Sequence, residues 1–153
     1  MRLEENLKKY KIVLPEPKDP VGSYLATKKS GHFLYISGQI SADENGKLIK
    51  GKVGKDLNTN EGYEAAKRCG LAILSQVKKA CDNNNLKIKS CLKLTGYVNS
   101  TEDFIDQPKV INGASEILTK LLDEDGLHVR AAVSANSLPL GVAVEVDAIF
   151  ELN

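Results

Sequence analysis

Two charged side chains stand out in the closing stretch GLHVRAAVSANSLPLGVAVEVDAIFEL, which otherwise reads as two apolar strands. Arg130 lies within HVRAAVS, and because strand side chains alternate between two faces, it shares its face with Ala132 and Ser134. These small neighbours leave space beside the guanidinium. An arginine with such space can hold a small carboxylate through two parallel hydrogen bonds, so this strand is a candidate site for an anionic ligand.

Glu145 is the second charge, and it lies between two valines on the last strand. A carboxylate there either faces solvent or turns into a crevice, where it can hold or deprotonate a water molecule. The competing interpretation of Arg130 is a salt bridge to Glu145, Asp147 or Glu151 on the neighbouring strand. Spacing alone favours that salt bridge, because strand arginines commonly pair in this way.

Familiar catalytic and metal-binding motifs are missing. The chain has no GxSxG nucleophile elbow, no GxxxxGK[ST] phosphate loop, no HExxH zinc helix and no GxGxxG turn after a strand. Its cysteines, Cys69, Cys81 and Cys91, form no CxxC pair, and only His32 and His128 could join them, so we expect no metal site. We expect the three thiols to be buried as small apolar groups.

The charge balance argues against a polyanionic partner. Lysine and arginine number 21 against 20 acidic residues, a formal net charge of +1, which supplies no excess of positive charge for a nucleic-acid backbone. No window has the length and purity of a membrane span, and the first twenty residues lack the apolar run of a signal peptide. We therefore expect a cytoplasmic protein that binds neither nucleic acid nor membranes.

Helical spacing of apolar residues predicts two main helices. One covers residues 59–84, with Thr59 or Asn60 available as its N-cap, and the second lies within 101–126 and stops at Gly126. Strand-like runs precede, separate and follow these helices. The last two flank a turn that contains proline and glycine, and we expect them to form a hairpin.

These elements predict one α+β domain over residues 20–153, preceded by a helical extension and a proline-containing linker at residues 1–19. Two helices can cover one sheet face, but the strands carry apolar residues on both alternations, as Phe33 and Tyr35 against Leu34 illustrate. A second copy of the chain is the economical cover for the other face, so we expect a homo-oligomer with sites between subunits.

Four blocks of the sequence resemble the RidA/YjgF family of reactive enamine/imine deaminases: GSYLATKKSGHFLYISGQI, LKLTGYVNSTEDF, VINGASEIL and VRAAVSANSLPLGVAVEVDAIF. The resemblance covers about Pro20 to Glu151. Its most specific parts are the arginine followed at a fixed interval by VEV, and the SGQI marker. It implies a chorismate-mutase-like α+β fold, with a mixed sheet and two helices on one face, assembled as a homotrimer with three clefts between subunits.

The resemblance also implies roles for individual residues. Arg130 matches the arginine that binds the substrate carboxylate, and Glu145 matches the glutamate that positions water. The implied reaction is hydrolysis of a 2-imino acid, or its enamine tautomer, to a 2-oxo acid and ammonia without a cofactor. Further substrate-binding positions are implied at Tyr24, Ser37, Asn112 and Ala132.

The chain departs from the family pattern at two places. Many members carry a cysteine where this chain has Ala132, and a proline or alanine where it has His128, so the chain resembles a divergent branch. The alternative function is a non-catalytic regulator that binds a small carboxylate or metabolite in the same cleft. RNA cleavage or translation inhibition, attached to the endoribonuclease L-PSP-like part of the family, is disfavoured by the near-neutral charge.

Overall fold

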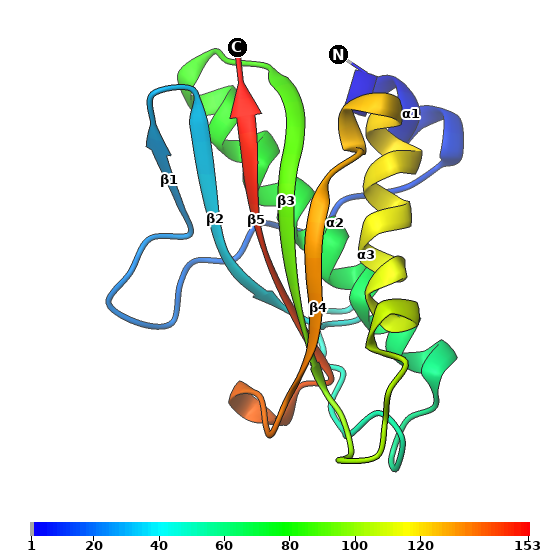
Figure 1. Cartoon of the computed structure of the whole chain (residues 1–153). Helices are drawn as coiled ribbons and strands as arrows, with labels where there is room; N and C mark the ends of the chain where they lie inside the picture. Colours follow the sequence, from blue (N-terminus) through cyan, green and yellow to red (C-terminus); the bar gives the residue numbers. More distant parts are fainter. Residues whose placement is uncertain (1) are drawn as a thin grey trace.

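The computed structural model describes residues 2–153, and its elements alternate between strands and helices (Figure 1). The helices are α1 (Arg2–Tyr10), α2 (Thr59–Asn84) and α3 (Gln107–Leu122), with short 3-10 turns η1 (Asp123–Gly126) and η2 (Pro139–Gly141). The strands are β1 (Thr27–Ser30), β2 (Phe33–Ile40), β3 (Ile88–Asn99), β4 (Val129–Ala135) and β5 (Val144–Leu152).

The five strands form one mixed sheet in the order β1-β2-β5-β3-β4. All neighbours are antiparallel except β3 and β4, which are parallel because α3 carries the chain back between them. Helices α2 and α3 contact each other and pack on one face of the sheet; in Figure 1, α2 runs behind the strands and α3 lies beside β4. The prediction of an α+β fold with two helices on one face of a mixed sheet is confirmed.

The predicted C-terminal hairpin is wrong. Strand β3 lies between β4 and β5, so the last two strands are not neighbours, and β4 forms the edge of the sheet. The alternating pattern identifies a strand but not its partner. Here the β3-α3-β4 connection places β4 on the far side of β3, and the chain then crosses back to add β5 between β2 and β3.

The core lies between the sheet and the two long helices. Side chains from alternate positions of the central strands fill it, including the fully buried Leu94 and Phe150. The three cysteines are free and buried in this core, as predicted, and burial raises the pKa of each thiol. Thiols in such surroundings are poor nucleophiles, so they serve as small apolar side chains.

The opposite face of the sheet has no helix over it within residues 2–153 (Figure 1). Phe33 and Tyr35 of β2 point to this open face and remain 44% and 47% exposed. The prediction that both faces carry apolar side chains is therefore confirmed. That a second copy of the chain covers the open face remains a prediction.

Helix α2 begins at Thr59 as predicted, but its N-cap is Asn58 rather than Thr59 or Asn60. The Asn58 side chain accepts a hydrogen bond from the backbone N–H of Glu61 at 2.8 Å, and the Asn58 N–H donates to the Glu61 carboxylate at 3.1 Å. This reciprocal pair is a capping box, and it satisfies two backbone donors at the start of the helix.

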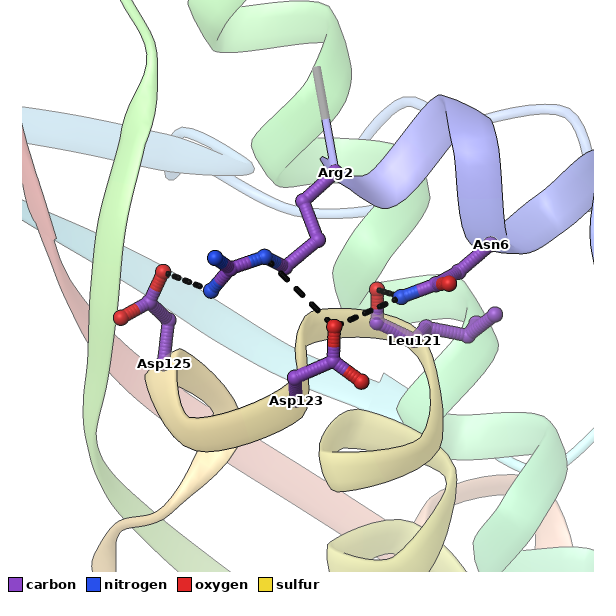
Figure 2. A network of polar contacts seen from close by, with 5 residues as sticks. All are labelled: Arg2, Asn6, Leu121, Asp123 and Asp125. Atoms are coloured by element: carbon purple, nitrogen blue, oxygen red, sulfur yellow. Dashed lines mark hydrogen bonds and ion pairs between the residues drawn. The ribbon is translucent and has the colours of Figure 1, made fainter.

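Helix α1 is fastened to the end of α3 by a polar network (Figure 2). The Asn6 amide donates to the carbonyl of Leu121 at 3.0 Å and to the carboxylate of Asp123 at 3.3 Å. Arg2 reaches Asp125 at 2.9 Å and Asp123 at 3.5 Å. Because both aspartates belong to η1, α1 holds the turn that leads from α3 into β4.

Candidate functional site

Three of the predicted site residues line one cavity. It has a volume of about 690 Å³ and lies beside β2 and the start of β5, where Tyr24, Ser37 and Glu145 contribute to its wall. Residues 15–21 form another part of that wall. The cavity therefore brings together the aromatic, hydroxyl and carboxylate groups that the resemblance implies.

Two side chains of α2 hold the proline-containing wall in place. Ser75 Oγ donates to the carbonyl of Pro15 at 2.6 Å, and Gln76 Nε2 donates to the carbonyl of Lys18 at 2.8 Å. Ser75 and Gln76 are 4% and 2% exposed, so these bonds form away from solvent. The segment that precedes β1 is thus part of the site and not a free linker.

A bulge in β2 brings Ser37 and Glu145 to the cavity. The pairing of β2 with β5 shifts after Ile36, which places Ser37 and Gly38 within the bulge. Ser37 Oγ donates to the carbonyl of Leu25 at 2.6 Å. A Cβ atom on Gly38 would lie 2.9 Å from Cδ of Glu145, so the glycine of the SGQ marker leaves the space that this carboxyl group occupies.

The surroundings of Glu145 disfavour its ionised form. Burial is the main cause that raises the pKa of this carboxyl group, and the neighbouring charge of Asp147 raises it further. Asp147 has a raised pKa for the same first reason, although Lys93 and hydrogen bonds from Thr95 and Tyr97 partly offset the effect of burial. A carboxylate with a raised pKa is a stronger base, which suits proton abstraction from water.

Arg130 lies on the other side of the sheet, where oxygen atoms of α3 accept its hydrogen bonds. Its Nη1 donates to Ser115 Oγ at 3.0 Å, and its Nη2 donates to the carbonyl of Pro108 at 3.1 Å, both on α3. Among residues 2–153, no carboxylate lies within ion-pair distance of this guanidinium; Glu151 pairs with Lys89 instead. The salt-bridge interpretation is wrong, because β4 and β5 are not neighbours.

Asn112 and Ala132 belong to the arginine side of the sheet. Asn112 lies four residues after Pro108 and three before Ser115, and this spacing puts all three on one stripe of α3, facing Arg130. Ala132 is two residues after Arg130 and shares its strand face, so no large side chain separates the guanidinium from this part of β4.

The two groups of site residues lie on opposite faces of the sheet. Arg130 pairs in register with Leu94, which points toward the helices, whereas Glu145 pairs with Tyr97, which points to the open face. Paired residues share a face, and successive residues alternate. One chain therefore cannot place Arg130 and Glu145 around the same small ligand.

Ser115 and His128 are polar neighbours of Arg130 that the sequence did not indicate as a pair. Ser115 Oγ lies 2.8 Å from His128 Nε2, and His128 Nδ1 lies 2.6 Å from the carbonyl of Gly126. The two side chains are thirteen residues apart on different elements. No local motif indicates such a contact, because it depends on how β4 packs beside α3.

Two other features are absent from residues 2–153. No group of three or more His, Cys, Asp or Glu residues is arranged to hold a metal ion. No helix in this range is long and apolar enough to cross a membrane.

Comparison with known proteins identifies the family. The family model described as "YjgF/chorismate mutase-like, putative endoribonuclease" matches residues 4–152, nearly the whole chain. The chain belongs to the YjgF/chorismate-mutase-like family. This match confirms the resemblance to RidA/YjgF proteins that the four sequence blocks indicate, and it agrees with the mixed sheet and paired helices of the fold.

Several known proteins are similar to this chain over most of their length. Protein TCP17 of Trypanosoma cruzi is 38% identical over 153 residues, covering 99% of this chain and 95% of that protein. The solved structure of Atu1372 from Agrobacterium tumefaciens, a protein of unknown function, is 38% identical with a TM-score of 0.89, covering 99% and 93%. The mouse 2-iminobutanoate/2-iminopropanoate deaminase is 30% identical over 132 residues, covering 84% and 81%.

Proposed function

We propose that this YjgF-family protein hydrolyses reactive 2-imino acids, or their enamine tautomers, to 2-oxo acids and ammonia. The observation that carries the proposal is the guanidinium of Arg130, which neutral oxygen atoms hold in place while no carboxylate within residues 2–153 neutralises its charge. Such a group suits the carboxylate of a small acid. The activity named for the mouse relative supports the same substrate class.

Glu145 supplies the chemistry in this proposal. It accepts a proton from a bound water while the water oxygen forms a bond to the C=N carbon and the π electrons move to nitrogen. Glu145 returns that proton to nitrogen, which gives the carbinolamine. The carbinolamine hydroxyl then passes its own proton, by way of Glu145, to the same nitrogen as the C–N bond breaks, so that the 2-oxo acid forms and ammonia leaves. Positioning by Arg130 makes the attack effectively intramolecular, and the raised pKa of Glu145 strengthens it as a base.

The complete site requires a second copy of the chain. Arg130 and Glu145 lie on opposite sheet faces, so the arginine of one subunit would meet the glutamate of another. The open face, with its exposed Phe33 and Tyr35, offers an apolar surface for that contact. We propose a homotrimer with three such sites, in line with the family resemblance, and no bound cofactor.

The direct test uses imines generated in place by an amino-acid oxidase acting on alanine or 2-aminobutyrate. The wild-type protein should accelerate loss of the imine, and Arg130→Ala should lower kcat/KM by at least about a hundredfold because a charged hydrogen-bond pair is lost. Arg130→Lys keeps the charge but not the planar fork and should recover only part of the rate. An Arg130→Ala protein with full activity would rule out the assignment.

A non-catalytic carboxylate binder is the second candidate. Ala132 favours it, because the family resemblance implies a cysteine at this position in many members. Calorimetric titration with 2-oxobutanoate separates the two: binding without any imine hydrolysis would favour the regulator. In both cases Arg130→Ala should abolish binding.

A further inference from the structure

A chain of hydrogen bonds runs from Arg130 to the backbone at the end of η1. Arg130 Nη1 lies 3.0 Å from Ser115 Oγ, which lies 2.8 Å from His128 Nε2, while His128 Nδ1 lies 2.6 Å from the carbonyl of Gly126. Three elements meet here: α3 supplies Ser115, η1 supplies Gly126, and His128 immediately precedes β4. The bonds of Ser115 to Arg130 and to His128 have ordinary length, and the bond from His128 to the Gly126 carbonyl is slightly shorter.

Chemistry fixes the direction of every bond in this chain. The carbonyl of Gly126 can only accept, so Nδ1 of His128 carries a proton, and in a neutral imidazole Nε2 then offers a lone pair. Ser115 must therefore donate its hydroxyl proton to Nε2. Its oxygen lone pairs are left to accept from Arg130, which can only donate.

The backbone at Gly126, where this series of hydrogen bonds ends, has little freedom to move. Gly126 is buried, and a Cβ atom there would collide with the carbonyl of Leu118, so the backbone of η1 is packed directly against α3. Burial lowers the pKa of His128, and the nearby charge of Arg130 lowers it further, although the bond to Gly126 acts in the opposite direction. A neutral imidazole preserves the direction of the hydrogen bonds near neutral pH.

This series of hydrogen bonds leaves several N–H donors of Arg130 free to bind a ligand. A guanidinium has five N–H donors, and here one goes to Ser115 and one to the carbonyl of Pro108, which leaves three. Two fixed donors set the plane of the guanidinium, and the remaining donors can present the parallel pair that a carboxylate needs.

We propose that Ser115 and His128 are positioning residues that orient Arg130 for carboxylate binding, forming a relay from the guanidinium through Ser115 and His128 to the carbonyl of Gly126. This inference rests on the proposed role of Arg130 as the carboxylate-binding group. Neither residue touches the substrate in this scheme. Their contribution is to hold the guanidinium in one orientation before the ligand arrives, which reduces the entropy lost on binding.

Three variants and one matched control test the relay in the imine-hydrolysis assay. Ser115→Ala removes the hydroxyl, and His128→Asn keeps a donor near Nδ1 for Gly126 but removes the acceptor that Ser115 requires. Each should raise KM about tenfold, the effect of one hydrogen bond to a charged group, with kcat within about threefold of wild type. Ser115→Thr retains the hydroxyl and should restore KM to within about threefold of wild type.

The matched control is Thr119→Ala, which removes a hydroxyl from the next turn of α3. In the part of the chain that the structure describes, Thr119 Oγ1 bonds only to the backbone carbonyl of Glu116, so KM should not change. Unfolding curves and light scattering should show that all four proteins fold and assemble like wild type. Unchanged KM in both Ser115→Ala and His128→Asn would overturn the relay, and so would an equal KM increase in Thr119→Ala.

Nitrogen-15 NMR tests the relay without reference to activity. In the wild-type protein His128 should show a protonated Nδ1 and an unprotonated Nε2, and the Arg130 guanidinium should rotate slowly about its Nε–Cζ bond. Ser115→Ala should speed that rotation, whereas Thr119→Ala should not. If wild type hydrolyses no imine, the proposed function fails while this measurement still decides on the relay; a His128 protonated at Nε2, or unchanged Arg130 rotation in Ser115→Ala, would refute it.

Discussion

At the level of single residues, the site holds one charge in an environment that disfavours it and another that has no opposite charge beside it within residues 2–153. Glu145 has a raised pKa because it is partly buried beside Asp147, and within residues 2–153 Arg130 is bound by neutral oxygens only. Groups in such environments reduce stability unless a ligand or partner compensates, and they concentrate at functional sites. Residue types and neighbours singled out both residues, spacing favoured a salt bridge for Arg130, and the family resemblance implied their roles in a site. None of these indicated that the two residues lie on opposite faces.

Replacing Glu145 should stabilise the protein while it removes activity. Because its pKa is raised in the folded state, the charged form disfavours folding at pH values above the folded-state pKa, and this penalty disappears as the pH falls below the unfolded value. Glu145→Gln should therefore raise Tm at pH 7.5, with the difference vanishing near pH 4, about the ordinary glutamate pKa. The measurement is thermal unfolding across this pH range.

Glu151→Gln is the control for this prediction, since Glu151 lies on the same strand and face but pairs with Lys89 at 3.0 Å. Loss of the Glu151 carboxylate should leave Tm unchanged or slightly lower, because exposed ion pairs contribute little to stability. In the activity assay, wild-type kcat should fall as the pH drops through the raised pKa of Glu145, at higher pH than an ordinary glutamate would give. A lower Tm for Glu145→Gln at pH 7.5 would contradict the argument.

At the level of elements, the sequence predicts what each segment forms better than what it pairs with. The helix at residues 59–84 was predicted with both ends correct because small and apolar residues recur at helical spacing over seven turns. The β4–β5 hairpin was wrong because strand pairing depends on the β3-α3-β4 crossover, which no local pattern specifies. The contact between Ser115 and His128 was missed for the same reason.

Helix α1 should stabilise the arginine side of the site through η1. The buried Asn6 amide caps the Leu121 carbonyl at the end of α3 (Figure 2), so Asn6→Ala leaves a buried acceptor unsatisfied and should lower the free energy of unfolding by about 1–3 kcal/mol. Arg2→Ala breaks only exposed ion pairs and should cost about 0–1 kcal/mol. Denaturant unfolding at one protein concentration measures both.

Because η1 carries Gly126, Asn6→Ala should also raise KM for the imine, whereas Lys8→Ala on the exposed side of α1 should change neither stability nor KM. A loss of stability in Asn6→Ala with unchanged KM would show that α1 acts on the fold alone. Equal destabilisation by Arg2→Ala and Asn6→Ala would contradict the ranking by burial.

At the level of the whole molecule, the two faces of the sheet carry different groups of residues. The helix side buries the core and carries Arg130 at the sheet edge, whereas the open side carries Glu145 and the exposed aromatics of β2. A single chain thus supplies both halves of the proposed site without joining them. Tyr35→Glu should prevent assembly by placing charge on the open face, and sedimentation should then show monomers without imine hydrolysis.

Mixing two inactive variants tests whether the site is shared. Arg130→Ala retains Glu145, and Glu145→Gln retains Arg130, so a contact between one subunit of each kind can restore a complete site. If subunits mix randomly when the two are co-expressed in equal amounts, about a quarter of the intersubunit sites should be complete, with a corresponding share of wild-type activity. The control is wild type co-expressed with the chain that carries both Arg130→Ala and Glu145→Gln, because it dilutes the functional residues to the same extent. No recovery in mixed assemblies, confirmed by native mass spectrometry to contain both chains, would mean that Arg130 and Glu145 do not meet across a subunit contact.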